Sequence, residues 1–139
     1  KGCRVVTVEG YRHWSRLIRA RLDETLGSAA SAVEFREIAG INDDEPPQDE
    51  YVRQVHNGGP WDLILVDGAH RLACLKAARD ELRPNGVLIF DNADFEEYGE
   101  VPKLLPDFER QSFSGLGVGR RWTTQTDVYR RIPSKTATR

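Results

Sequence analysis

Four polar residues follow two short apolar runs of the chain. The first run, Leu-Ile-Leu-Val, ends at Asp67, and His70 follows three positions later; the second run, Val-Leu-Ile-Phe, ends at Asp91 and Asn92. Apolar runs of this length predict strands that are buried on both faces. In α/β proteins the carboxyl ends of neighbouring parallel strands form the edge at which ligands bind. We therefore expect the four polar side chains to lie along one rim.

Three of these residues offer oxygen atoms that could hold a metal ion. Asp67, Asp91 and Asn92 would supply ligands of the kind that a hard, octahedral cation such as Mg²⁺ prefers. Such an ion would hold neighbouring hydroxyl oxygens of an acceptor and lower the pKa of one of them. Alternatively, Asp67 and Asn92 only cap the segments that follow them, as Asp and Asn often do.

His70 is the candidate for proton transfer. An imidazole titrates near neutral pH and can accept the proton of a reacting hydroxyl group. The alternative is a histidine that makes a structural hydrogen bond at the start of a helix. The two cysteines, Cys3 and Cys74, have neither metal-binding nor disulfide spacing, and we expect both to be structural.

The elements around these residues alternate between strands and helices. Strands are predicted at 4–9, 33–38, 63–66 and 87–90, helices at 11–26 and 70–82, shorter helices at 51–56 and 98–105, and a closing hairpin from 110–118 and 122–131. This order predicts an α/β, Rossmann-like fold with a mostly parallel sheet, helices on both faces and a C-terminal antiparallel hairpin.

The length of the chain indicates the number of domains, and its charge indicates which partners to expect. The 139 residues suit one domain, expected at 1–132 with a polar tail at 133–139. The net charge is −2, so we expect neither nucleic acid nor a membrane as partner. No apolar run is long enough for a membrane span, and we expect a cytoplasmic protein. The chain has no Met, so we expect it to begin partway into a longer product.

Four motifs follow one another along the chain: Glu9 ends an early strand, Asp67 follows a buried strand, a Leu-Arg-Pro-Asn-Gly-Val turn lies at 82–87, and a hairpin closes the chain. Together they resemble the class I S-adenosylmethionine-dependent methyltransferases. Within that superfamily, Val-Asp-Gly-Ala-His at 66–70 followed by Asp-Asn at 91–92 is similar to the small-molecule O-methyltransferases, including the metal-dependent catechol and caffeoyl-CoA type. The resemblance covers residues 4–131.

The resemblance implies a cofactor and a division of roles. Glu9 would accept hydrogen bonds from the ribose hydroxyls of S-adenosylmethionine, since a carboxylate can accept from both hydroxyls of a cis-diol. Gly10 and Asp67 would also contact the cofactor. Asp67 and His70 would act on a hydroxyl group of a small-molecule acceptor, with Mg²⁺ as a possible second cofactor.

The chain also departs from the pattern of that superfamily. Its members begin with a central strand and a glycine-rich turn, and no such turn precedes Glu9; the glycines at 115–119 belong to the hairpin. A nicotinamide-binding enzyme would need the same turn. The alternative function is therefore a truncated or degenerate domain without activity. It would act as an interaction module, with open strand edges at 5–8 and 63–66 that favour a homodimer.

Overall fold

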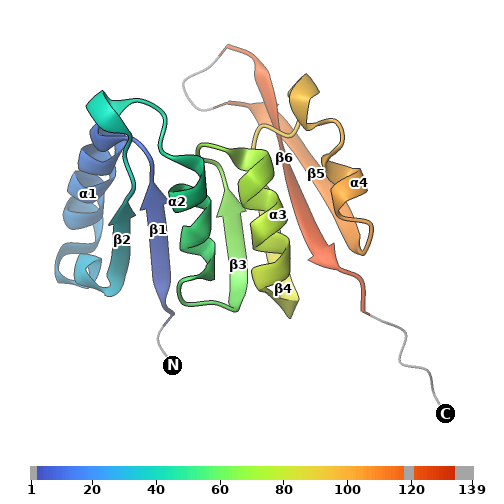
Figure 1. Ribbon diagram of the computed structural model, residues 1–139, viewed down its shortest axis with the longest axis horizontal. Helices are drawn as coiled ribbons and strands as arrows, with labels where there is room; N and C mark the ends of the chain where they lie inside the picture. Colours follow the sequence, from blue (N-terminus) through green and yellow to red (C-terminus); the bar gives the residue numbers. More distant parts are fainter. Residues whose placement is uncertain (1–2, 118–120, 134–139) are drawn as a thin grey trace. The chain divides into compact units, whose positions relative to one another are not determined.

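The computed structural model describes residues 3–117 and 121–133, which form two compact units, Lys1–Gln54 and Val55–Arg139. Each unit is described here by itself (Figure 1). The predicted polar tail lies, except for Pro133, outside the described residues. Most of the connection predicted between the hairpin strands lies outside them as well.

The first unit contains two parallel strands and two helices. Its elements are β1 (Val5–Glu9), α1 (Arg12–Leu26), β2 (Val33–Glu37) and α2 (Gln48–Arg53), with 3-10 turns at Gly27–Ala32 and Ile41–Asp43 and a third, Gln54–His56, at the boundary of the two units. Strand β1 pairs with β2 in parallel. The predicted strands and helices of this part of the chain are thus confirmed, with ends that differ by a few residues.

The two helices of this unit lie on opposite faces of its sheet. From α1, the guanidinium of Arg19 stacks on the Phe35 ring at 4.0 Å from its centroid. The next residue of the strand, Arg36, donates from Nη1 to the carbonyl oxygen of Gln54 at 2.8 Å, just beyond α2. Because successive side chains of a strand point to opposite faces, α1 and α2 cover different faces.

A residue distant in sequence caps the start of α1. Tyr11, at the N-cap position, makes no side-chain hydrogen bond to the helix. The carboxylate of Asp43 instead accepts from the backbone N–H of Arg12 and lies 3.1 Å from the ring nitrogen Nδ1 of His13. The hydrogen bond from the Arg12 backbone, followed by that from the His13 side chain, lowers the pKa of Asp43. Asp43 therefore ties the loop after β2 to α1.

The second unit contains a four-stranded mixed sheet. Its elements are β3 (Trp61–Val66), α3 (Arg71–Glu81), β4 (Leu82–Phe90), α4 (Val101–Leu104), β5 (Phe108–Leu116) and β6 (Thr123–Arg131), with a 3-10 turn at Glu96–Tyr98. The strand order is β3-β4-β6-β5. The β3–β4 pair is parallel, whereas β4–β6 and β5–β6 are antiparallel.

The prediction of a mostly parallel sheet is wrong for this unit. The hairpin strand β6 pairs directly with β4, so the hairpin adds two antiparallel pairs to the single parallel pair. The parallel strands β1 and β2 form a separate sheet and do not change this balance. The predicted antiparallel hairpin itself is confirmed.

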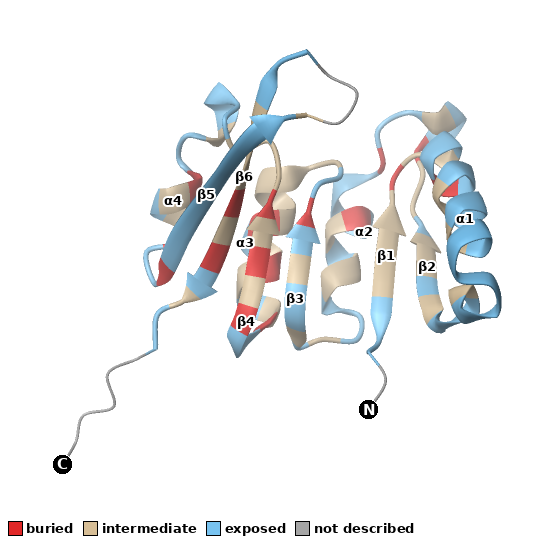
Figure 2. Cartoon of the chain, turned by 180° about the vertical axis from the view of Figure 1, so that it is seen from behind, coloured by how far each residue is buried: buried red, intermediate tan, exposed pale blue. Residues whose placement is uncertain are grey.

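The helices of the second unit cover only one face of its sheet. Figures 1 and 2 show α3 and α4 on the same side of the strands. On β3, Leu63 and Leu65 are 55% and 57% exposed. Among the described residues of this unit, no helix covers the second face, whereas helices lie on both faces of the sheet in the first unit. The prediction that β3 is buried on both faces is wrong, because its leucines are exposed.

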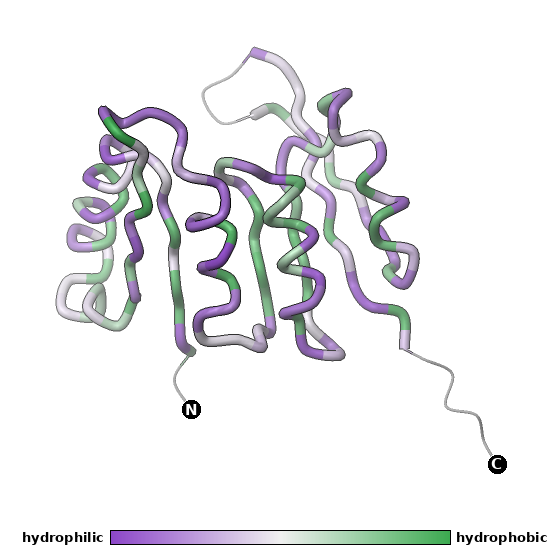
Figure 3. Tube along the Cα trace, in the orientation of Figure 1, coloured by the Kyte–Doolittle hydropathy of each residue, from purple (hydrophilic) through white to green (hydrophobic). Residues whose placement is uncertain are grey.

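The core of this unit lies between the sheet and its helices. Leu75 and Ala78 of α3 are buried together with Leu88 and Phe90 of β4 and Tyr129 of β6. Figure 3 shows β3 as a hydrophobic strand, as the apolar run predicts. No helix among the described residues is long and apolar enough to cross a membrane.

The turn predicted at 82–87 lies within β4, where it takes the form of a bulge. Leu82 pairs with Trp61 and Val87 pairs with Leu63, so the four residues between Leu82 and Val87 face a single residue of β3. A Cβ atom on Gly86 would lie 3.0 Å from the carbonyl oxygen of Arg83, closer than side chains usually pack, so a larger residue would require this backbone to shift. The bulge thus brings Val87–Phe90 into register beside β3.

Candidate functional site

The structure brings the predicted rim residues of β3 and β4 together. Val66 and Phe90 are partners in the parallel ladder, so Asp67 and Asp91 directly follow paired positions. The backbone N–H of Asp91 donates to the carbonyl oxygen of Val66 at 3.1 Å. The two apolar runs therefore end side by side, as the sequence predicts.

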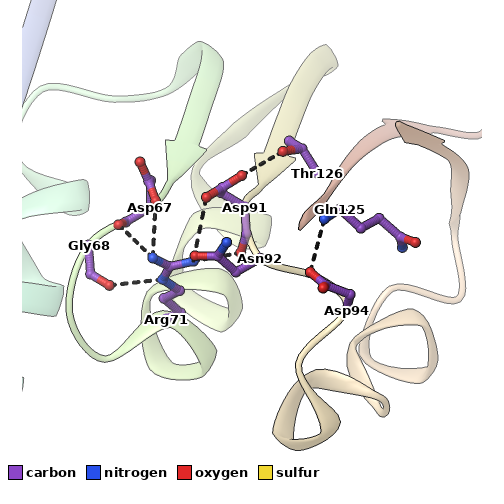
Figure 4. Close-up of polar contacts among 8 residues, drawn as sticks. All are labelled: Asp67, Gly68, Arg71, Asp91, Asn92, Asp94, Gln125 and Thr126. Carbon is purple, nitrogen blue, oxygen red and sulfur yellow. Dashed lines mark hydrogen bonds and ion pairs between the residues drawn. The ribbon is translucent and has the colours of Figure 1, made fainter. Parts of the chain in front are cut away.

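Arg71, which the sequence analysis does not single out, lies at the centre of this rim (Figure 4). Its Nη2 donates to the carbonyl and carboxylate oxygens of Asp67, both at 3.0 Å. Its Nη1 donates to the carbonyl oxygen of Asp91 at 2.7 Å and to Oδ1 of Asn92 at 2.8 Å. Its Nε donates to the carbonyl oxygen of Gly68 at 3.1 Å. Arg71 thus connects the ends of β3 and β4.

Strand β6 holds the loop after β4 from the other side. The Thr126 hydroxyl donates to Oδ1 of Asp91, and the Gln125 backbone N–H donates to Oδ1 of Asp94 at 2.9 Å (Figure 4). The backbone N–H of Ala93 donates to the carbonyl oxygen of Gln125 at 2.8 Å. Asp91 is therefore fixed between β3, Arg71 and β6.

Two rim residues adopt left-handed backbone conformations. His70 has φ = 50° and Asn92 has φ = 53°. His70 precedes α3 rather than lying in its first turn, and its carbonyl oxygen accepts from the backbone N–H of Cys74. Non-glycine residues rarely adopt this conformation, and it persists where the surrounding contacts fix the backbone. The five hydrogen bonds of Arg71 to the flanking segments are such contacts.

In the first unit, Glu9 is the last residue of β1 and Gly10 directly follows it. Oε1 of Glu9 accepts from the backbone N–H groups of Gly10 and Tyr11 at 2.8 and 3.1 Å. Among residues 3–117 and 121–133, none donates to the other carboxylate oxygen of Glu9. A Cβ atom on Gly10 would lie 2.6 Å from Cγ of Pro46, so packing within the unit explains this glycine. Glu9 keeps one carboxylate oxygen available for a ligand hydroxyl.

The predicted metal ligands do not form an open metal site. Oδ1 of Asp67 and Oδ1 of Asn92 accept from Arg71, and Oδ2 of Asp91 lies 3.9 Å from its Nη1. Within the part of the chain that the structure describes, no group of three His, Cys, Asp or Glu side chains is arranged to hold a metal ion. With Arg71 in this place, the residues do not fit Mg²⁺.

The cysteine beside the rim is poorly suited to react. The Cys74 thiol is half-buried on α3 and donates to the carbonyl oxygen of Ala69, and burial raises its pKa to about 11. At pH 8 we expect roughly one thiol in a thousand to be ionised. A disulfide reagent should therefore label exposed Cys3 quickly and Cys74 only after unfolding. Equal rates for both thiols in the folded protein, compared with a Cys3→Ser variant, would contradict this.

The chain matches known proteins in structure and not in sequence. No family model matches the chain, and no curated protein matches it in sequence. Solved structures do match: the chain has the fold of the class I S-adenosylmethionine-dependent O-methyltransferases over about 93% of its length. This agrees with the resemblance that the motifs indicate.

Three of the matching structures are methyltransferases from different bacteria. The O-methyltransferase TomG of Streptomyces achromogenes, in complex with S-adenosylmethionine, has a TM-score of 0.68 at 17% identity, covering 93% of this chain. The O-methyltransferase of Bacillus cereus, in complex with S-adenosylhomocysteine, has a TM-score of 0.67 at 19% identity, covering 94%. Precorrin-6y C5,15-methyltransferase of Geobacter metallireducens has a TM-score of 0.63 at 11% identity, covering 93%.

The chain spans less than two thirds of the length of the two O-methyltransferases, 62% of TomG and 64% of the Bacillus protein. It spans 67% of the Geobacter enzyme. At these identities the matches show the fold.

Proposed function

We propose that the chain functions as an S-adenosylmethionine-dependent methyltransferase that acts on a hydroxyl group of a small molecule. The observation that carries the proposal is the match of nearly the whole chain to O-methyltransferase structures that hold S-adenosylmethionine or S-adenosylhomocysteine. Glu9 at the end of β1, and Asp67 and Asp91 directly after β3 and β4, support it, because α/β folds bind ligands at these strand ends.

The proposed roles follow from the chemistry of each side chain. Glu9 accepts a hydrogen bond from the ribose through the oxygen that the turn at Gly10 leaves available. When bound, S-adenosylmethionine would supply a methyl group on a positively charged sulfur for transfer to the acceptor oxygen, and S-adenosylhomocysteine would leave. Positioning the acceptor would be the main task of the protein. His70 takes the proton that the hydroxyl group loses, and Asp67 orients the acceptor beside it.

Calorimetric titration with S-adenosylhomocysteine tests this function without knowledge of the acceptor. We expect the full chain to bind with a dissociation constant below about 1 mM, a binding free energy of roughly −4 kcal/mol or better. Glu9→Ala should weaken binding at least about tenfold, because a charge-assisted hydrogen bond contributes roughly 1.5–3 kcal/mol. Glu24→Ala removes an exposed carboxylate of α1 that pairs with Arg21, and it should leave the affinity unchanged.

The second candidate function is an interaction module without activity. It is favoured by the exposed leucines of β3 and by the edge positions that β1 and β3 hold in their own sheets. The two candidates give different results in one experiment. No heat with S-adenosylhomocysteine, together with a dimer mass in light scattering, would overturn the enzyme proposal and favour the module.

A further inference from the structure

The guanidinium of Arg71 has no donor left for a ligand. An arginine side chain carries five N–H donors. The structure gives each an acceptor: three carbonyl oxygens, of Asp67, Gly68 and Asp91, and the side-chain oxygens of Asp67 and Asn92. The side chain is 15% exposed. Arg71 therefore binds the chain itself and serves as a positioning residue.

These acceptors include the oxygens that the sequence analysis assigns to a metal ion. A Mg²⁺ ion would need them at about 2.1 Å in octahedral geometry. The lone pairs of Asp67 Oδ1 and Asn92 Oδ1 instead face Arg71, and Oδ1 of Asp91 accepts from Thr126. A divalent cation beside a fixed guanidinium would also be repelled. One of the two cations must be absent from the rim.

We infer that Arg71 is a built-in cation that takes the place of a divalent metal ion at the ends of β3 and β4, so that this rim works without metal. Its charge offsets the carboxylates of Asp67 and Asp91, at 3.0 and 3.9 Å. Its bonds to the three carbonyl oxygens hold the backbone on both sides of the rim. A metal ion would offset the charge of the carboxylates but would hold the backbone on both sides of the rim only in part.

The inference rests on the proposed function only for the purpose of the rim, which is to bind the acceptor. The exclusion of metal by Arg71 does not depend on that function. Its test measures cation binding, so its failure is distinguishable from failure of the methyltransferase proposal. Binding of Mn²⁺ to the full chain is followed by the electron paramagnetic resonance signal of the free ion. We expect no binding to the wild type at about 1 mM Mn²⁺, which is within the range of weak protein sites.

Variants of Arg71 show whether it excludes the metal. Arg71→Gln removes the charge, and we expect Mn²⁺ affinity to rise at least about tenfold. The added change Asp91→Asn should abolish that binding. Arg71→Lys keeps a cation and should bind no Mn²⁺. Arg79→Gln, which changes a partly exposed arginine of the same helix, is the matched control and should also bind none. A folded Arg71→Gln variant that gains no Mn²⁺ binding would overturn the inference.

A measurement on the wild type keeps the inference testable if Arg71→Gln does not fold. We expect the melting temperature of the full chain to be the same in Mg²⁺ and in a chelator. An ion that binds only the folded protein at a hundred times its dissociation constant would raise the melting temperature by about 10 °C. A rise of that size, lost in Asp91→Asn, would show that the rim holds a metal ion and that the inference is wrong.

Discussion

Replacement of Asp127 by alanine is expected to lower the free energy of unfolding of the second unit by about 3 kcal/mol. Asp127 is 2% exposed on β6. Its carboxylate accepts from Gln125 Nε2 at 2.9 Å and from the Tyr129 hydroxyl at 3.1 Å, and it lies 3.7 Å from Nη1 of Arg110. Alanine would leave the buried Tyr129 hydroxyl without this acceptor and would create a cavity beside it. Denaturant unfolding measures the loss.

The fluorescence of Trp61 confines this measurement to the second unit. In a background with Trp14→Phe and Trp122→Phe, Trp61 is the one remaining tryptophan, and its indole N–H donates to the carbonyl oxygen of Val55 at 2.7 Å. Glu109→Ala, an exposed carboxylate on the neighbouring strand β5, is the control and should change stability by less than about 0.5 kcal/mol. Equal effects of the two substitutions would show that the buried network does not stabilise the unit.

The same network makes stability depend on alkaline pH. Burial, and then the charge of Asp127, raises the pKa of Tyr129 well above its usual value. The folded state therefore keeps this phenol protonated while the unfolded chain ionises it near pH 10. The contribution of Tyr129 to stability is present below about pH 10 and is lost as the pH rises further. Tyr129→Phe should reduce that alkaline loss.

The rim could be predicted from sequence because local pattern determines it. An apolar run of four residues predicts a strand, and its end is marked by the acidic residue that follows. The run does not determine burial, since Leu63 and Leu65 of β3 are exposed. Two such runs joined by one helix must lie in parallel. Asp67, Asp91 and Asn92 therefore fall where the structure places them. The roles assigned to them stay predictions.

The role of Arg71 could not be predicted from sequence because its partners are mostly backbone atoms. A carbonyl oxygen carries no sequence signal, and three of the five acceptors of Arg71 are carbonyl oxygens. One signal was present: Asp67 and Arg71 are four residues apart, the spacing of an ion pair on a helix. Asp67 precedes α3, so that spacing gave only a weak hint.

The direction of the strands in the second sheet could not be predicted from sequence either, because no local pattern specifies which strand pairs with β4. The alternation of strands and helices predicts parallel neighbours only as long as each strand is followed by a helix. After β4 the chain makes short helical turns and then a hairpin, and nothing local states whether β5 or β6 pairs with β4. The structure selects β6, which places Thr126 beside Asp91. In the resulting sheet, β3 and β6 flank β4 and both contact Asp91.

Phe90→Ala is expected to have the largest effect on stability, a loss of about 4 kcal/mol in the free energy of unfolding of the second unit. Phe90 is fully buried at the end of β4, and its ring meets that of Tyr98 edge to face at 5.1 Å between centroids. Truncation to alanine removes this contact and leaves a cavity beneath Tyr98. Unfolding followed by Trp61 fluorescence gives the magnitude.

A matched phenylalanine separates burial from residue type in this prediction. Phe113 on β5 is 52% exposed, and Phe113→Ala should cost less than about 0.5 kcal/mol. Because Phe90 directly precedes Asp91, a cavity beneath it should also loosen the Asp91 backbone, whose carbonyl oxygen accepts from Arg71. Amide hydrogen exchange at Asp91 should then quicken in Phe90→Ala and not in Phe113→Ala. Unchanged exchange at Asp91 would mean that Arg71 and β6 hold the rim without help from the core beneath it.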